Sequence, residues 1–206
     1  MRNLEIDVDW GAFVAGDQRV FECVYDTFFD PLYNYGRNYT DEEELVEDAI
    51  QELFVRFWKN RANLTMPASL RNYLFKAFRN HLRDRIKASG RYVTADFDER
   101  YPFEVVISAE ETRIASEMDE AMRTRLTKAM EQLTARQKEA IFLRFYEGFS
   151  YEEIAHTMEI TVKATYKLMA RSIEAMRHEM GGSKTSVLLI ILRTLDFNSG
   201  HKNGKR

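Results

Sequence analysis

Apolar residues recur at steps of three and four along most of the chain, which is the period of an α-helix. In the first half these stripes run over Val20–Phe28, Val46–Phe57 and Leu70–Phe78. Asp17 is a candidate N-cap for the first stripe, and Ser69 is one for the third. The residues from Asn60 to Ser69 include Pro67 and predict a loop. The first half is therefore predicted to be helical.

The second half has the same periodicity, with clearer helix boundaries. Leu126 to Leu133 form one stripe, and Thr134 and Ser150 each precede a Gln or Glu three residues later, as in a capping box. We expect a helix over Ala135–Glu147 with Gly148 just beyond its end. A short helix after Ser150, a tight turn and a helix capped by Thr161 together predict a helix-turn-helix. A plain helical hairpin with a solvated basic face remains the alternative.

Only three prolines and nine glycines occur in 206 residues, which disfavours a turn-rich β fold. The predicted fold class is all-α, with two small helical domains over residues 10–91 and 121–180, joined by an acidic linker over 92–120. The tail over 181–206 could be an extra packing helix, an inhibitor contact or a frayed end, and we favour packing. The single cysteine, Cys23, excludes a disulfide framework and is expected to be buried.

The net charge of −3 conceals an uneven distribution. Residues 51–91 contain ten basic and two acidic residues, and residues 161–206 contain nine and three. Residues 1–50 and 92–120 are strongly acidic, with thirteen and nine acidic residues. Two basic blocks predict two anion-binding surfaces, although two ordinary solvated helix faces would give the same pattern.

Each basic block contains a candidate nucleic-acid surface. Basic and polar residues without any acidic one share a face of the predicted helix after Ser69, where they would follow phosphates: Lys76, Arg79, Asn80, Arg83 and Lys87. The last helix presents a mixed outward face suited to phosphates and base edges in a major groove: Val162, Lys163, Tyr166, Lys167 and Ala170.

Four stretches resemble bacterial RNA polymerase sigma factors of the extracytoplasmic-function (ECF) group. Glu147–Ala155 is similar to the start of the DNA-binding helices in the last conserved region, and Leu133–Phe142 is similar to the helix before them. Glu47–Trp58 resembles the polymerase-binding helix, and Leu70–Asn80 resembles the promoter-melting helix. Two such domains in this order, at this length, are typical of the ECF group.

The resemblance implies a transcription initiation factor whose site residues fall into three groups. The residues that would bind core RNA polymerase are Asp48, Gln51, Glu52, Arg56 and Trp58, with core packing as the alternative for Trp58. The minus-ten element would be read by Asn63, Thr65 and Met66 and held by Lys76, Arg79, Asn80 and Arg83. The minus-thirty-five element would be contacted by Thr161, Val162, Lys163, Tyr166, Lys167 and Arg171.

The expected partners are core RNA polymerase, promoter DNA and an anti-sigma factor, often membrane-anchored in this family. We expect no catalytic residues, metal, cofactor or small-molecule substrate, because the four histidines lack metal spacing and no nucleophile or phosphate-loop motif is present. The acidic start of the chain does not resemble a signal peptide, which predicts a cytoplasmic protein. A regulator that binds duplex DNA without polymerase is the rival hypothesis, but it leaves residues 45–90 unexplained.

The sequence departs from the family pattern at Glu159, where the turn often has glycine. Glu159 must adopt a left-handed conformation or the turn must differ, and this affects the contacts expected at Thr161 and Val162. Tyr73 replaces the more usual Trp, a mild change.

Overall fold

The structure is a computed structural model that describes residues 6–89, 101–105 and 120–180. Within these ranges the secondary structure is helical and contains no strand, which confirms the predicted fold class. The chain divides into two compact units: the first contains the described residues up to Pro102 together with His156–Met158, and the second contains the other described residues from Phe103 onward. The domain boundaries given above remain predictions. None of the helices in the described ranges is both long and apolar enough to cross a membrane.

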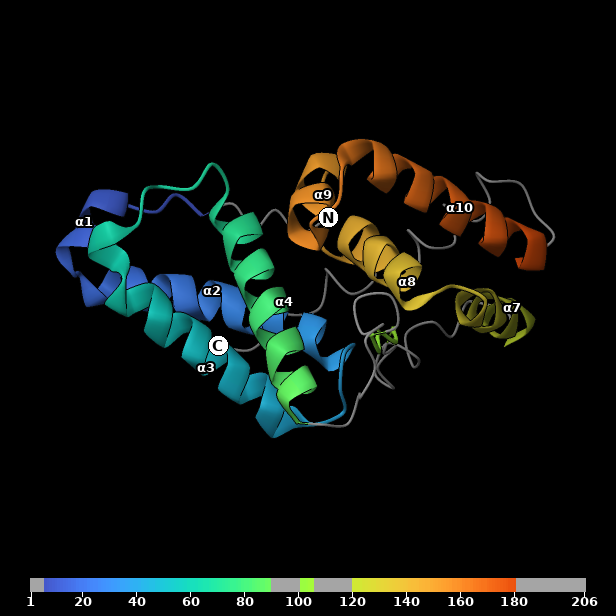
Figure 1. The fold of residues 1–206 in the computed structure, drawn as a ribbon, viewed down its shortest axis with the longest axis horizontal. Helices are drawn as coiled ribbons and strands as arrows, with labels where there is room; N and C mark the ends of the chain where they lie inside the picture. The colour runs from blue at the N-terminus through green and yellow to red at the C-terminus, as the bar shows by residue number, and fades with distance from the viewer. Residues whose placement is uncertain (1–5, 90–100, 106–119, 181–206) are drawn as a thin grey trace. The chain divides into compact units, whose positions relative to one another are not determined.

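The first unit is built from α1 (Trp10–Ala15), α2 (Gln18–Arg37), α3 (Glu43–Lys59), the 3-10 turn η1 (Arg61–Asn63) and α4 (Leu70–Ala88). In Figure 1, α2 and α3 lie side by side and α4 crosses them. The predicted stripes supply the buried core, including Val24, Phe28, Ile50, Leu74 and Phe78. Burial of these apolar side chains stabilises the three-helix arrangement.

Helix α2 meets α3 and α4 at Gly36. A Cβ atom at this position would lie 2.6 Å from Val46 Cγ1 and 2.9 Å from Phe78 Cζ. Both neighbouring side chains are fully buried. Glycine is therefore what allows the three helices to approach this closely.

The caps and ends of the first unit agree with the sequence in part. The Asp17 carboxylate accepts a hydrogen bond from Arg19 N, and Ser69 Oγ accepts one from Asn72 N, so both predicted N-caps are confirmed. Glu42 occupies the N-cap position of α3 without a side-chain cap. Helix α1 was not predicted, and Cys23 is exposed rather than buried. Cys23 lies on the outer side of α2, next to the buried Val24.

The second unit contains α7 (Glu120–Glu131), α8 (Ala135–Ile141), the π-helical turn η3 (Phe142–Tyr146), α9 (Tyr151–Met158) and α10 (Val162–Met180). Helix α10 packs against α7 and α8. Both predicted capping boxes are present, at Thr134 with Gln137 and at Ser150 with Glu153. The single helix expected over Ala135–Glu147 is instead divided into α8 and η3.

The predicted acidic linker is described only at residues 101–105 and Glu120. Tyr101 belongs to the first unit and is 1% exposed. Phe103 belongs to the second unit, where its buried ring lies 6.0 Å from that of Phe142. This stretch therefore contains two buried aromatic residues, which its acidic composition did not reveal. The predicted tail over 181–206 lies outside the described residues.

Candidate functional site

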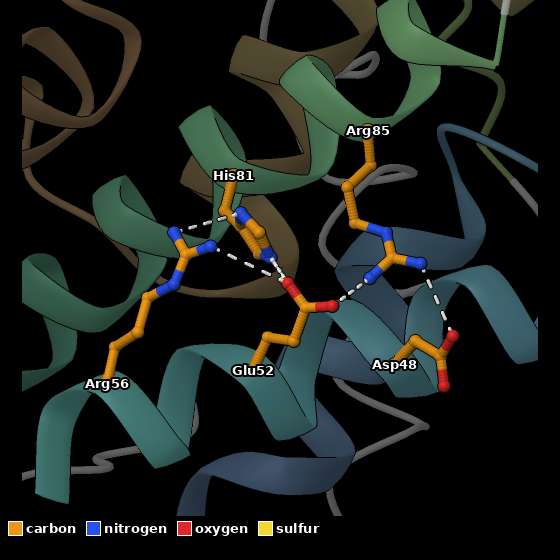
Figure 2. A network of polar contacts seen from close by, with 5 residues as sticks. All are labelled: Asp48, Glu52, Arg56, His81 and Arg85. Carbon is orange, nitrogen blue, oxygen red and sulfur yellow. Dashed lines mark hydrogen bonds and ion pairs between the residues drawn. The ribbon is translucent and has the colours of Figure 1, made fainter. Parts of the chain in front are cut away.

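Three of the five residues predicted to bind polymerase lie together on the outer side of α3. Asp48, Glu52 and Arg56 are spaced by one helical turn, and their side chains are between 46% and 64% exposed. They meet two residues of α4, His81 and Arg85, in a polar network (Figure 2). We call these five residues the α3–α4 network.

Glu52 is the centre of the α3–α4 network. Its Oε2 lies 2.8 Å from His81 Nε2 and 3.6 Å from Arg56 Nη2, while Oε1 accepts a hydrogen bond from Arg85 Nη1. Arg85 Nη2 also reaches Asp48 Oδ2 at 3.3 Å. Figure 2 shows how the network holds the acidic side chains of α3, and these side chains remain exposed.

The charges around Glu52 and His81 shift the pKa of both groups downward. Burial acts to raise the pKa of Glu52, but Arg85 and His81 outweigh it and hold the pKa below its ordinary value. Burial lowers the pKa of His81, and Arg56 lowers it further while Glu52 opposes the shift. A neutral His81 ring can accept a hydrogen bond at Nδ1 from Arg56 Nη1, 3.4 Å away, while its Nε2 stays in close contact with Glu52.

The other two predicted polymerase contacts, Gln51 and Trp58, differ in how exposed they are. Gln51 is exposed on α3, but Trp58 is only partly exposed. The Trp58 ring packs 4.9 Å from the ring of Phe21, and the guanidinium of Arg61 lies over it at 4.2 Å. This packing is compatible with the alternative of a core role, and the polymerase contact of the partly exposed Trp58 stays a prediction.

The loop between α3 and α4 presents the residues predicted to read the minus-ten element. Asn63 ends the turn η1, and Thr65 and Met66 follow it on the surface. Met66 is 66% exposed, which is unusual for a large apolar side chain. The structure therefore leaves all three side chains accessible to a ligand.

The basic stripe of α4 is less open than its sequence pattern predicts. Lys76, Asn80 and Arg83 are partly exposed, but Arg79 is 2% exposed. The Arg79 guanidinium lies 5.6 Å from the centre of the Tyr101 ring, and that of Arg83 lies 4.9 Å from it. Arg79 is therefore covered in this structure, which helix spacing alone did not reveal, and its phosphate contact stays a prediction.

Helices α9 and α10 form the predicted helix-turn-helix. Ala155 is buried within α9, and Glu159 ends this helix with φ of 55° and ψ of 47°. The left-handed conformation is therefore the one of the two predicted alternatives that occurs. Ile160 N then donates to Ala155 O at 3.0 Å, and Thr161 Oγ1 accepts from Ala164 N at 3.1 Å, so Thr161 caps α10 as predicted.

The outward side of α10 carries every residue predicted for the minus-thirty-five contact. Val162 is 37% exposed and Tyr166 is 53% exposed. The remaining members are also exposed, and we call the whole set the recognition face: Thr161, Val162, Lys163, Tyr166, Lys167 and Arg171. Buried Thr165, Met169 and Ser172 lie on the opposite side of α10 and hold it against the unit.

Two residues that the sequence did not single out support the recognition face. The Tyr151 ring of α9 lies 4.3 Å from the Tyr166 ring, edge on. Arg144 lies over Tyr151 at 5.2 Å and donates from Nη1 to Phe149 O at 2.7 Å. The contact of Tyr151 with Tyr166 arises from the pairing of α9 with α10, which no local spacing indicates.

Both helical units match models of the sigma-70 family, so the class is a two-domain protein of the sigma-70 type. Residues 24–92 match sigma-70 region 2, and residues 123–176 match sigma-70 region 4. The ECF RNA polymerase sigma factor SigX of Bacillus subtilis is 24% identical over 182 residues, which cover 79% of this chain and 88% of the relative. SigL of Mycobacterium tuberculosis, another ECF sigma factor, is 26% identical over 175 residues, covering 81% and 94%.

A solved structure shares the fold. The sigma factor RpoE of Bartonella quintana, in complex with the anti-sigma factor NepR, matches with a TM-score of 0.55 and 22% identity, over 78% of this chain and 96% of RpoE. The chain belongs to the ECF group of bacterial RNA polymerase sigma factors. It is a transcription initiation factor that acts with core RNA polymerase at specific promoters.

Proposed function

We propose that the recognition face of α10 reads the minus-thirty-five element of the promoter. The observation that carries this assignment is a row of exposed side chains on one side of a capped second helix, with Lys163 and Lys167 one turn apart. Such a helix fits a major groove, where lysines bind phosphates or guanine edges and Val162 suits a thymine methyl group. Tyr166 adds an aromatic contact that Tyr151 holds in place.

The first unit handles the minus-ten element in this proposal. Exposed Asn63, Thr65 and Met66 would receive an unstacked base, because the loop supplies polar partners and an apolar surface. Lys76, Asn80 and Arg83 of α4 would bind the backbone phosphates of the separated strands. Arg79 joins them only when Tyr101 leaves its ring position.

The α3–α4 network is the proposed polymerase-binding surface, together with Gln51. Asp48, Glu52 and Arg56 are exposed on α3 and yet held in place by one another and by the more buried His81 and Arg85, which reduces the entropy lost when a charged partner binds. His81 and Arg85 extend this surface beyond the residues that the sequence suggested. Trp58 contributes by supporting the end of α3.

A test of the polymerase surface is the charge reversal Arg56→Glu, which places a second carboxylate beside Glu52. We expect binding to core polymerase to weaken by roughly tenfold or more. The matched control is Lys59→Glu, because Lys59 is also exposed on α3 but lies outside the network. Equal losses in both variants would contradict the assignment, since general charge would then explain the effect.

A test of the recognition face is Lys167→Ala, measured on a promoter fragment and on a random duplex of equal length. A lysine that reads a base should contribute about 1–3 kcal/mol to promoter binding and much less to random DNA. Lys128→Ala on α7 is the control in the same unit. An equal loss on both duplexes, with a flatter salt dependence, would instead assign Lys167 to phosphate contact.

We also infer an anti-sigma partner that covers both DNA-binding surfaces, and action in the cytoplasm without catalysis by the chain itself. The support is the fold shared with RpoE, a sigma factor solved with the anti-sigma factor NepR. The test is purification of the tagged chain from cells. Recovery of polymerase subunits together with one further protein that competes with them is the expected result, and recovery of polymerase alone would remove the anti-sigma inference.

A further inference from the structure

Tyr101 lies on the basic side of α4 within the first unit. Its side chain is 1% exposed, and its ring stacks on the ring of Tyr39 with 5.6 Å between centroids and an interplanar angle of 23°. The guanidinium carbons of Arg83 and Arg79 lie 4.9 Å and 5.6 Å from the same ring centre. We call Tyr39, Arg79 and Arg83 the tyrosine cradle.

The tyrosine cradle has an unusual composition for a protein core. Arginine is among the residues least often fully buried, yet Arg79 is 2% exposed. Tyr39 follows the end of α2 and is itself 2% exposed, with its hydroxyl 3.2 Å from that of Tyr35. The aromatic ring of Tyr39 beside two guanidinium groups favours a ligand that has a planar ring with a negatively charged group next to it.

An unstacked nucleotide matches this description. Proteins hold single-stranded bases by stacking them on aromatic rings and on guanidinium planes, while cations bind the adjoining phosphates. The Tyr101 ring makes the same stacking contacts that a base would make, because it faces both the Tyr39 ring and the two arginines. It supplies no phosphate.

We propose that the tyrosine cradle is a binding site for an unstacked DNA base and that Tyr101 occupies this site in the free protein. The inference rests on the proposed function, in which the first unit handles separated promoter strands. Tyr101 leaves the cradle when DNA enters, and the base replaces its ring on Tyr39. The free chain therefore binds single-stranded DNA only in the fraction of molecules in which the cradle is open.

The experiment measures binding of the full chain, without polymerase, to a fluorescein-labelled single-stranded oligonucleotide by anisotropy. Tyr101→Ala removes the competing ring, and we expect it to bind about tenfold more tightly than the unchanged chain. The matched control is Tyr33→Ala, the same substitution at a half-buried tyrosine of α2 that stacks on Phe29. This control should show no gain.

A double variant separates competition from loosening of the fold. If the uncovered cradle causes the gain, Tyr101→Ala combined with Arg83→Ala should lose most of it, because an arginine of the site is then missing. A gain that persists without Arg83, or no gain in Tyr101→Ala despite a lowered melting temperature, would overturn the inference and assign Tyr101 to core packing. Promoter-dependent transcription by the unchanged chain with core polymerase is measured separately, so its failure would overturn the proposed function instead.

Discussion

Gly36 offers a sharp test of how the first unit is assembled, because a methyl group added there would clash with buried neighbours. In Gly36→Ala the new Cβ would approach Val46 Cγ1 to 2.6 Å and Phe78 Cζ to 2.9 Å. Neither neighbour can move aside cheaply, since both are fully buried between helices. Overpacking of this kind costs about 1–3 kcal/mol.

The helix propensity of alanine offsets part of that cost. Replacing a glycine within a helix by alanine contributes roughly 0.5–1 kcal/mol, so the net destabilisation should be near 1 kcal/mol, within a range of about 0–2.5 kcal/mol. For a domain of this size each kcal/mol lowers the melting temperature by roughly 4–8 °C. Calorimetry or circular dichroism of the full chain measures the shift.

Gly11→Ala is the matched control for Gly36→Ala. Gly11 is exposed in α1, and a Cβ there would meet only Asp9 Oδ1 at 3.4 Å, an ordinary contact. This variant should melt at the same temperature or higher. If Gly36→Ala also melts unchanged or higher, the close approach of α2 to α3 and α4 is wrong, and with it the geometry that places the α3–α4 network.

Two further predictions concern the turn and the network. Glu159→Gly should stabilise the second unit by up to about 1 kcal/mol, because glycine adopts the left-handed conformation at this position without strain. The control, Glu152→Gly within α9, should destabilise the unit. Destabilisation by both substitutions would contradict the observed turn. His81 has a lowered pKa in the folded chain, so the unfolded chain binds more protons and stability falls as pH drops below 6.5. In His81→Asn the loss over that range should be smaller in urea titrations, and an unchanged slope would contradict the pKa direction.

The periodic pattern was sufficient to predict most of the fold. Steps of three and four placed the buried sides of α3, α4 and α10, and short polar motifs located the caps at Ser69, Thr134 and Ser150. These features are local, so the residues that determine them lie within a few positions of one another. The recognition face was predictable for the same reason, since one helix carries all of it.

Contacts between distant segments could not be predicted in this way. Arg79 lies on the predicted basic stripe, but Tyr101 covers it from 22 positions further along the chain. Trp58 has the spacing of an exposed anchor, and its packing on Phe21 depends on how α2 meets α3. The contacts of His81 and Arg85 with α3 likewise arise only when α3 and α4 pack together. Helical spacing identifies a face, and tertiary packing decides what covers it.

Run-off transcription from genomic DNA fragments with purified core polymerase measures directly whether the chain directs initiation. We expect that adding the chain produces transcripts from a small set of fragments that share two sequence elements, at minus ten and minus thirty-five. Arg56→Glu should strongly reduce all of these transcripts, and Lys167→Ala should weaken those that depend on the minus-thirty-five element. An absence of promoter-dependent transcripts, with tight binding of the chain alone to duplex DNA, would contradict the account and favour a regulator that acts without polymerase.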